Sequence, residues 1–388
     1  MSSLEKNTWI LDQWYAQDVA GNVSYSASGD AGSLFSMGYN NGGDLGQNNR
    51  TKYSSPVQIP GSWKDVGGVK ADGTLWSWGY NGVGALGHNN RTNYSSPVQV
   101  GGDTTWYEAY GLIDNQNTEK EGFAIKTDGT LWTWGYNNEG SLGQNNRTKY
   151  SSPTQVGSGT DWLTPGHNKF GWSANYQSAS HIKTDGTLWA WGMNWMGTLG
   201  QNSETYYSSP VQIPGTTWKG ISRGIRVGMA GTKTDGTLWV WGYNEYGQMG
   251  QNNRQQYSSP TQVGTDSTWH LVNGTFGTLS ATKTDGTLWA WGYNLQGQLG
   301  QGGVISNPTK ISSPVQIGSS TDWSRPVALG QNAMGAMKTD GTMWVWGEGA
   351  GGILGQNSLS DEDEPVQIPG AGINMRGDGS VTHILKEA

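Results

Sequence analysis

The sequence predicts an all-β protein, a seven-bladed β-propeller whose ring is closed by N- and C-terminal strands sharing a blade. Three observations support this: a segment that recurs along the chain, a strand-and-turn pattern inside each copy, and a C-terminal segment that fits the first copy. The length of 388 residues suggests two or three domains at about 150 residues each. The repeats instead predict one propeller over residues 30–388, with residues 1–29 packing on or completing a blade.

The repeated segment reads Asp-Gly-Thr-Leu/Met-Trp-x-Trp-Gly. It starts at Asp72, Asp128, Asp185, Asp235, Asp285 and Asp340, and a degenerate copy spans residues 31–38. Asp-Gly between short apolar runs indicates a hairpin, because the central residues of such a turn adopt positive φ. Side chains alternate along a strand, so the two Trp of each copy lie on one face.

These paired tryptophans recur blade after blade, and we interpret them as packing residues between blades rather than ligand-binding residues. The pairs are Trp76 and Trp78, Trp132 and Trp134, Trp189 and Trp191, Trp239 and Trp241, Trp289 and Trp291, and Trp344 and Trp346. Burial of each ring removes roughly 150–250 Å² from water, which makes the pairs a major source of stability.

The end of the chain predicts how the ring closes. The segment 381–386 resembles the strand that precedes each Asp-Gly hairpin, but no hairpin follows it. We expect it to pair with the first hairpin and to complete the first blade; an open β-solenoid is the alternative, and it would need polar caps. Nine residues separate Trp63 from Asp72, against 16 to 23 in later copies, so the second blade lacks about one strand. Residues 23–27 are a candidate replacement there or in the first blade, and the sequence does not decide between these positions.

Composition excludes several functional classes. The chain has no Cys, which removes disulfide frameworks and thiol catalysis, and its net charge of −7 argues against nucleic acid as a partner. No apolar run reaches the roughly 18 residues of a membrane span, so no membrane insertion is expected. The five His are scattered without metal-ligand spacing, and no catalytic residue, metal or cofactor is predicted. The N-terminus has no apolar signal-peptide core, which predicts cytoplasmic synthesis.

The pattern Lys-Thr-Asp-Gly-Thr-Leu-Trp-x-Trp-Gly-x-Asn-x-x-Gly-x-Leu-Gly resembles the regulator of chromosome condensation repeat family over residues 30–388. The resemblance implies a seven-bladed propeller with a shared closing blade. The stretches Asn-Asn-Arg-Thr-x-Tyr-Ser-Ser-Pro-Val-Gln are most similar to bacterial and bacteriophage members. This similarity implies a non-enzymatic structural protein of a virion: a capsid decoration, tail or receptor-binding protein acting in the virion or outside the cell. The alternatives are a bacterial adhesin that binds carbohydrate or protein and, less favoured, a guanine-nucleotide exchange factor for a small GTPase.

Aromatic residues that depart from the repeat are the candidate binding site. The fourth copy carries such residues in an insertion and in two loops, and they are Trp172, Tyr176, Trp195, Tyr206 and Tyr207. An exposed aromatic cluster suits a protein partner, such as another virion or surface protein, or a glycan. The alternative is that the insertion folds over its own blade. The acidic stretch 361–364 is interpreted as a solvated loop in preference to a divalent-cation site.

Overall fold

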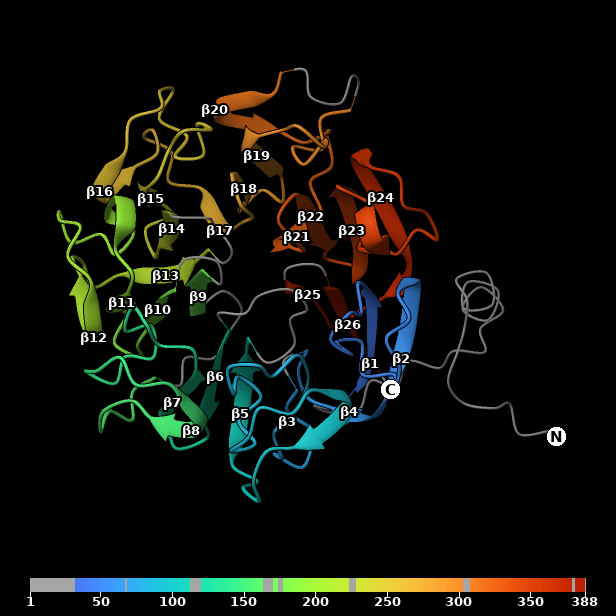
Figure 1. The fold of residues 1–388 in the computed structure, drawn as a ribbon. Helices are drawn as coiled ribbons and strands as arrows, with labels where there is room; N and C mark the ends of the chain where they lie inside the picture. The colour runs from blue at the N-terminus through green and yellow to red at the C-terminus, as the bar shows by residue number, and fades with distance from the viewer. Residues whose placement is uncertain are drawn as a thin grey trace.

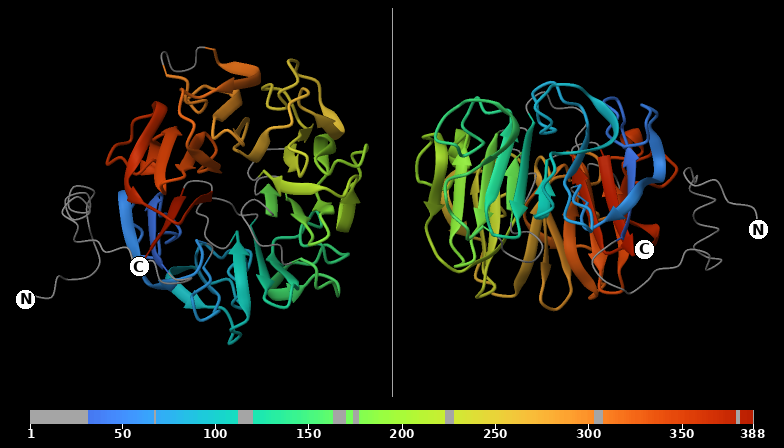
Figure 2. Two further views of the ribbon diagram at one scale, coloured as in Figure 1. Left: turned by 180° about the vertical axis from the view of Figure 1, so that it is seen from behind. Right: turned by 90° about the horizontal axis from the view of Figure 1, so that it is seen from below.

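The computed structural model describes residues 32–387, apart from residues 67, 112–119, 163–169, 174–176, 223–227, 303–307 and 379–380. The described chain forms a ring of antiparallel sheets around a central axis (Figure 1), and Figure 2 shows the same ring from behind and from below. Within these residues the helical elements are two 3-10 turns, η1 (Trp195–Gly197) and η2 (Ala350–Gly352), and there is no α-helix. The predicted all-β propeller is therefore confirmed, whereas the segment 1–29 and Tyr176 lie outside the described residues.

The strands follow one another around the ring in chain order. In the first half they are β1 (Gly32–Gly38), β2 (Tyr53–Trp63), β3 (Trp76–Gly79), β4 (Tyr94–Gln99), β5 (Trp106–Tyr110), β6 (Glu121–Lys126), β7 (Leu131–Gly135), β8 (Tyr150–Gln155), β9 (Phe170–Ser173), β10 (Ser178–Ile182), β11 (Leu188–Gly192) and β12 (Tyr207–Ile213). In the second half they are β13 (Trp218–Ile221), β14 (Gly228–Lys233), β15 (Leu238–Gly242), β16 (Tyr257–Gln262), β17 (Trp269–Gly274), β18 (Thr278–Lys283), β19 (Leu288–Tyr293), β20 (Lys310–Gln316), β21 (Trp323–Ala328), β22 (Ala333–Lys338), β23 (Thr342–Gly347), β24 (Glu362–Ala371), β25 (Asn374–Asp378) and β26 (Val381–Glu387).

The expected closure of the ring is present. The closing blade has the order β2-β1-β26-β25, and β26 pairs antiparallel with β1 from Gly32↔Glu387 to Gly38↔Val381. The two ends of the described chain therefore meet inside one sheet. Ladder hydrogen bonds and side-chain packing hold the ring closed, with no covalent link across it.

The predicted ring of seven blades is present only in part: the second repeat, for which the sequence predicts the loss of about one strand, lacks two. The described residues form six four-stranded sheets, whereas β3 and β4 form a sheet of two strands. Two isolated bridges, Trp63↔Lys70 and Val69↔Leu75, are all that extends this short sheet toward the ring axis among the described residues. The physical reason is chain length, since too few residues lie between Trp63 and Asp72 to form the missing hairpin.

Two buried charged side chains fill the place of the missing strands. Asp65 accepts hydrogen bonds from the backbone N–H of Val69 at 2.8 Å and of Ala109 at 2.9 Å. Arg376, on β25 of the closing blade, donates to the carbonyl oxygen of Ala109 at 2.9 Å. Side chains thus satisfy both polar backbone groups of Ala109 on the edge of β5 that is not paired with β6. We call Asp65 and Arg376 the edge clamp.

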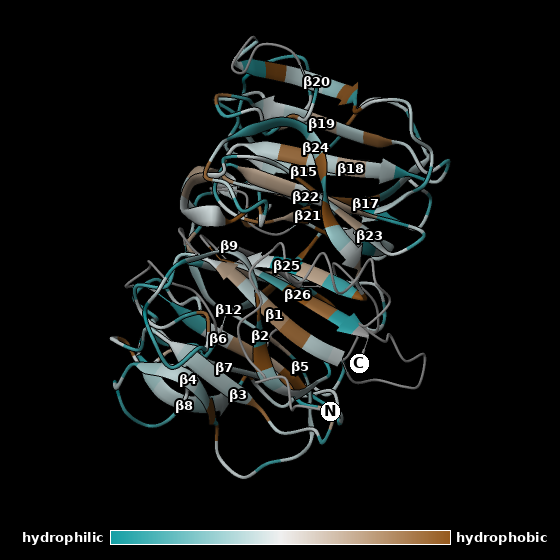
Figure 3. Cartoon of the chain, turned by 90° about the vertical axis from the view of Figure 1, so that its right-hand side faces the viewer, coloured by the Kyte–Doolittle hydropathy of each residue, from teal (hydrophilic) through white to brown (hydrophobic). Residues whose placement is uncertain are grey.

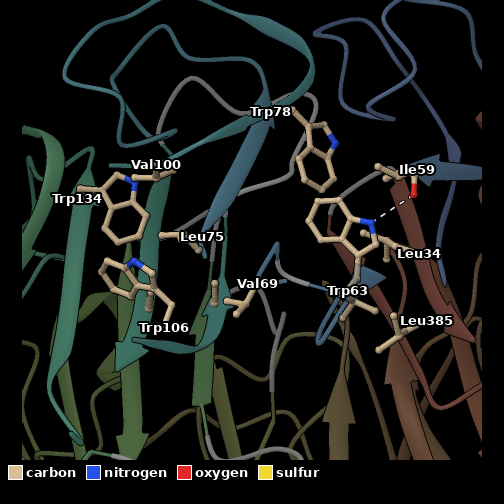
Figure 4. Packing of buried hydrophobic residues seen from close by; sticks show 13 residues of the cluster. Leu34, Ile59, Trp63, Val69, Leu75, Trp78, Val100, Trp106, Trp134 and Leu385 are labelled. Atoms are coloured by element: carbon tan, nitrogen blue, oxygen red, sulfur yellow. Dashed lines mark hydrogen bonds between the residues drawn. The ribbon is translucent and has the colours of Figure 1, made fainter. Parts of the chain in front are cut away.

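The apolar core is divided among the junctions between sheets. Six separate clusters of buried residues occur in the described chain, and Figure 3 shows apolar residues spread over the strands instead of forming one central layer. Figure 4 shows the cluster that joins the closing blade, the short sheet and β5–β8, where Trp63 packs edge-on against Trp78 at 5.5 Å. Stability is therefore distributed around the ring, as in other repeat proteins.

The second Trp of each pair is fully buried at these junctions. Its indole N–H donates to a backbone carbonyl of the preceding sheet in every copy. The bonds run from Trp78 to Asp44, Trp134 to Ala85, Trp191 to Ser141, Trp241 to Thr198, Trp291 to Gln248 and Trp346 to Gln298, at 2.7–2.9 Å. Each acceptor carbonyl precedes the Leu/Met-Gly of the repeat, which explains why that segment recurs. These tryptophans therefore connect each sheet to the previous one.

Candidate functional site

The two faces of the ring carry different loops. In each four-stranded blade other than the closing one, the Asp-Gly turn joins the second and third strands, and the connection to the next blade leaves from the same side, which we call the turn face. The opposite side, the loop face, carries the connections between the third and fourth strands. Trp195 lies in such a connection, between β11 and β12. Departures from the repeat in the fourth to sixth copies are therefore displayed on the loop face.

A continuous row of aromatic rings crosses three blades on the loop face. Trp195 stacks on Tyr243 with ring centroids 6.3 Å apart and an interplanar angle of 21°. Tyr243 contacts Tyr246 at 6.1 Å, and Tyr246 in turn contacts Tyr293 at 4.8 Å and Phe276 at 6.0 Å. We call these five residues the aromatic strip.

The strip is partly open to solvent. Trp195, at one end of the row, is 38% exposed, and Leu295, two residues after Tyr293 in the corresponding connection at the other end, is 44% exposed. The ammonium of Lys310 lies 4.9 Å from the centroid of the Tyr246 ring, which is a cation–π contact at the border of the strip. Burial raises the pKa of the Tyr293 hydroxyl, and nearby Tyr246 raises it further, so the neutral phenol persists at neutral pH.

The sequence-predicted residues that the structure describes lie in different surroundings. Trp172 lies in β9, where its backbone pairs with Ala179. Tyr207 is half-buried against the core cluster between β9–β12 and β13–β16. Tyr206 is half-buried near Glu139 of the preceding blade; burial first, and then Glu139 and Glu204, raise its pKa. Trp195 instead stacks on Tyr243 of the following blade, so Tyr206 and Trp195 turn toward opposite neighbours.

Sequence reasoning missed the tyrosines of the strip. Tyr243 and Tyr293 follow the closing Gly of their repeats, as Tyr does in most copies, and for that reason they were treated as part of the pattern. The available signal was their neighbours, because Trp195 stands where the earlier copies have Asn or Gly, and Tyr246 stands where they have Gly, Val, Glu or Met. Repeat register places these side chains on adjacent blades, so the row could have been predicted by aligning the copies.

The turn face carries a second repeated feature, a lysine between two tryptophans. One residue separates the lysine from the Asp of the Asp-Gly turn. Its ammonium lies over the first Trp of the pair and over the Trp that starts the innermost strand. We call each set a lysine cage. The cages are centred on Lys70, Lys126, Lys183, Lys233, Lys283 and Lys338, with 3.4–5.2 Å from ammonium to ring centroid.

Four cages also contain an aspartate. The ion pairs are Lys126–Asp103 at 2.5 Å, Lys183–Asp161 at 3.1 Å, Lys283–Asp266 at 2.6 Å and Lys338–Asp322 at 3.2 Å. The hydrogen bond from Lys126, together with those from Thr105, lowers the pKa of Asp103 to about 2. A cavity of about 340 Å³ opens beside the Lys183 cage, lined in part by Trp189, Gln144 and Ser209. The Lys183 cage therefore borders space that a side chain of another molecule is able to enter.

The pKa of Asp103 predicts a contribution to acid stability. Because the folded-state pKa is lower than the ordinary value of 3.8, the ionised carboxylate stabilises the fold above about pH 4, and this stabilisation is lost as the pH falls toward 2. Asp103→Asn should therefore reduce the denaturation midpoint at pH 7 but change it little at pH 2. Urea titrations of both proteins at pH 7, 4, 3 and 2 measure this. A midpoint difference that stays constant over the series would contradict the prediction.

Other types of site are not evident in the described chain. Across residues 32–387 with the gaps given above, no group of three or more His, Cys, Asp or Glu side chains is placed to hold a metal ion. The same residues include no helix long and apolar enough to cross a membrane. The acidic stretch 361–364 begins with Asp361, whose carboxylate accepts the backbone N–H of Gly349 at 2.9 Å. This aspartate therefore orders its own loop.

Comparisons with known proteins agree with the geometry. A search of curated protein sequences finds no match. Among solved structures, human WBSCR16 superposes with a TM-score of 0.73 at 16% identity, covering 92% of this chain and 99% of that one. Prp20p from Saccharomyces cerevisiae gives 0.72 at 17% identity over 95% of this chain and 94% of that one. Yeast RCC1 (Prp20) bound to Kap60 gives a TM-score of 0.71 at 17% identity, over 100% of this chain and 95% of that one. At these identities the likeness concerns the fold alone.

The family is established by the repeats themselves. The model of the regulator of chromosome condensation (RCC1) repeat matches residues 72–106, 128–162, 185–228, 235–272 and 285–333, which is more than half of the chain. These segments contain the Asp-Gly turns, the paired tryptophans and the start of the following innermost strand. The chain belongs to the regulator of chromosome condensation (RCC1) repeat family.

Proposed function

We propose that the protein is a non-enzymatic binding propeller that docks a partner protein on the aromatic strip of its loop face. The observation that supports this is the exposure of Trp195 and Leu295 at the two ends of a row of rings crossing three blades. Exposed apolar patches mark interaction sites, and binding hot spots are rich in Trp and Tyr. The rigid ring presents these rings with little ordering cost on binding.

The matched structures support a protein partner. Prp20p has described binding properties to Gsp1p and histones, and the yeast RCC1 structure holds Kap60. A protein-binding role for this chain is consistent with both. The virion assignment has no such support among the matched proteins, and neither has a glycan. The proposal also includes a ring of seven blades, in which the short sheet β3–β4 is a reduced blade beside the six four-stranded ones.

The test uses Trp195→Ala, with Leu359→Ala as the matched control. Leu359 is a 65% exposed apolar residue in the equivalent connection of the next blade, β21–β24, and is not part of the strip. Affinity capture from the native source should retain one protein on the wild type and on Leu359→Ala. Trp195→Ala should weaken its binding at least about tenfold, as expected for a hot-spot aromatic.

The other outcomes separate the alternatives. Equal capture by all three proteins would remove the strip from the interface. Binding of a glycan array that is lost in Trp195→Ala would favour the adhesin. Nucleotide release from a co-purifying small GTPase, accelerated by the wild type, would favour the exchange factor over a passive binding role.

A further inference from the structure

Two of the six lysine cages lack the aspartate that the other four contain. In the complete cages the carboxylate comes from the connection before the innermost strand, either three residues before the Trp, as Asp103 and Asp266, or directly before it, as Asp161 and Asp322. The connections before Trp63 and Trp218 read Ile-Pro-Gly-Ser and Ile-Pro-Gly-Thr-Thr, without an acid. These two cages therefore lack the aspartate because their connections contain no acidic residue.

The Lys233 cage keeps the geometry of the complete ones. Its ammonium lies 4.9 Å from the ring centroid of Trp218 and 4.0 Å from that of Trp239, close to the 4.7 and 4.1 Å of the Lys283 cage. Among the residues that the structure describes, no carboxylate forms an ion pair with Lys233. Burial lowers the pKa of the Lys233 ammonium, and the charge of Asp235 offsets this in part. The cage thus holds a cation whose direct counter-charge is missing.

The position of the absent carboxylate is occupied by Gly215. It lies three residues before Trp218, as Asp103 does before Trp106. A Cβ at Gly215 would lie 3.4 Å from Nε1 of Trp218 and 3.5 Å from Nζ of Lys233, in ordinary contact with both. The connection 214–217 is exposed, so the space above the ammonium is open to solvent. The Lys70 cage is tighter, because a Cβ at Gly61 would lie 3.2 Å from the Lys70 Cε.

We propose that the Lys233 cage is a binding site for a carboxylate of an acidic protein segment, which takes the place that aspartate holds in the complete cages. Four equivalent cages show that a carboxylate oxygen fits 2.5–3.2 Å from the ammonium. Cation–π contacts with the two indole rings hold the ammonium in its position. Asp235 does not fill the place: its Oδ1 accepts from the backbone and hydroxyl of Thr237 at 3.0 and 2.7 Å, and it forms no ion pair with Lys233. This site lies on the turn face and is independent of the aromatic strip.

The lysine ammonium itself provides the readout. Reductive ¹³C-methylation labels the lysines, and loss of one signal in Lys233→Arg assigns Lys233. An N-acetylated tetraglutamate peptide should shift the Lys233 signal in a saturable way, and a tetraglutamine peptide should not. The Lys283 signal should stay in place under both peptides, because Asp266 already occupies its cage.

Two variants exchange the complete and incomplete cages. Thr217→Asp places a carboxylate where Asp161 and Asp322 stand, at an exposed position, and should weaken peptide binding at Lys233 by about tenfold or more. Asp161→Thr removes the internal partner of Lys183 and should make the Lys183 signal respond to the peptide. Both changes copy residues that the chain already tolerates at the equivalent position, and circular dichroism verifies the fold.

The proposal fails if Thr217→Asp leaves the Lys233 response unchanged, or if tetraglutamate moves all lysine signals alike. An equal response of the Lys233 signal to inorganic phosphate would show that the cage binds anions in general, which would overturn a site specific for carboxylates. If no protein is captured in a Trp195-dependent way while the Lys233 signal still responds to tetraglutamate, only the proposed function is overturned. The two results are therefore distinguishable.

Discussion

Replacement of Trp241 by alanine should lower the free energy of unfolding by about 3–5 kcal/mol, the range for removal of a large buried aromatic side chain. Trp241 is fully buried between β9–β12 and β13–β16, where its ring packs edge-on against Trp218 at 5.6 Å. Its indole N–H also donates to the carbonyl of Thr198 at 2.8 Å. The substitution therefore opens a cavity and removes a connection between adjacent blades at once. Equilibrium urea denaturation followed by Trp fluorescence and circular dichroism measures the loss.

Two phenylalanine variants separate these contributions. Trp241→Phe keeps most of the ring but leaves the buried carbonyl of Thr198 without its donor, which should cost about 1–3 kcal/mol. Trp239→Phe is the matched control, because Trp239 is half-buried and its N–H bonds to Thr237 inside its own turn. We expect a loss below about 1 kcal/mol there. Equal losses at the two positions would contradict the role of the second Trp in joining the blades.

Asp65→Ala should destabilise the fold by about 2–5 kcal/mol, because each buried N–H left without an acceptor costs about 1–3 kcal/mol. Asp65 is 8% exposed and accepts from Val69 and Ala109. Without its carboxylate, the edge of β5 beside the short sheet loses one half of the edge clamp. The effect should appear locally as well, as faster amide hydrogen exchange at Val69 and Ala109.

The control for the clamp is an aspartate of the repeat. Asp72 accepts from the N–H and hydroxyl of Thr74 but is exposed, so water replaces its bonds in Asp72→Ala. We expect a loss of about 1 kcal/mol or less for that variant, as is typical of a single exposed turn residue. Asp65→Asn keeps one acceptor oxygen and should fall between the two. If Asp65→Ala costs no more than Asp72→Ala, the short sheet is held by apolar packing alone.

The repeated parts of the fold could be predicted from the sequence, because the same turn and strand signals occur in every copy. The Asp-Gly turns, the alternating tryptophans and the pairing of 381–387 with 32–38 follow from turn chemistry and strand periodicity. The edge clamp could not be predicted in this way. Asp65 and Arg376 each occur once, 311 positions apart, and only the three-dimensional gap left by the missing strands brings both to Ala109.

The candidate sites were predictable to a lesser degree. Trp195 stood out as a departure from its repeat, but its stacking partner Tyr243 belongs to the repeat and became visible only across the blade junction. The lysine cages had a signal in the sequence, since Lys precedes nearly every Asp-Gly turn, with Ala71 or Thr between them. The absence of an acid at Gly215 becomes informative only in the structure, where the Lys233 ammonium lies beside this position. Variation inside a repeat is informative once the contacts of the unvaried copies are known.

The shared closing blade also determines when the molecule is able to finish folding. Its pairing Gly32↔Glu387 joins positions at opposite ends of the described chain, so this sheet has the largest sequence separation of all. During synthesis the intermediate blades emerge and fold one after another, while the edge of β1 stays unpaired until β26 has emerged. Contacts so distant in sequence form slowly. The nascent chain therefore passes through an open arc of blades, and the pairing of β26 with β1 closes it.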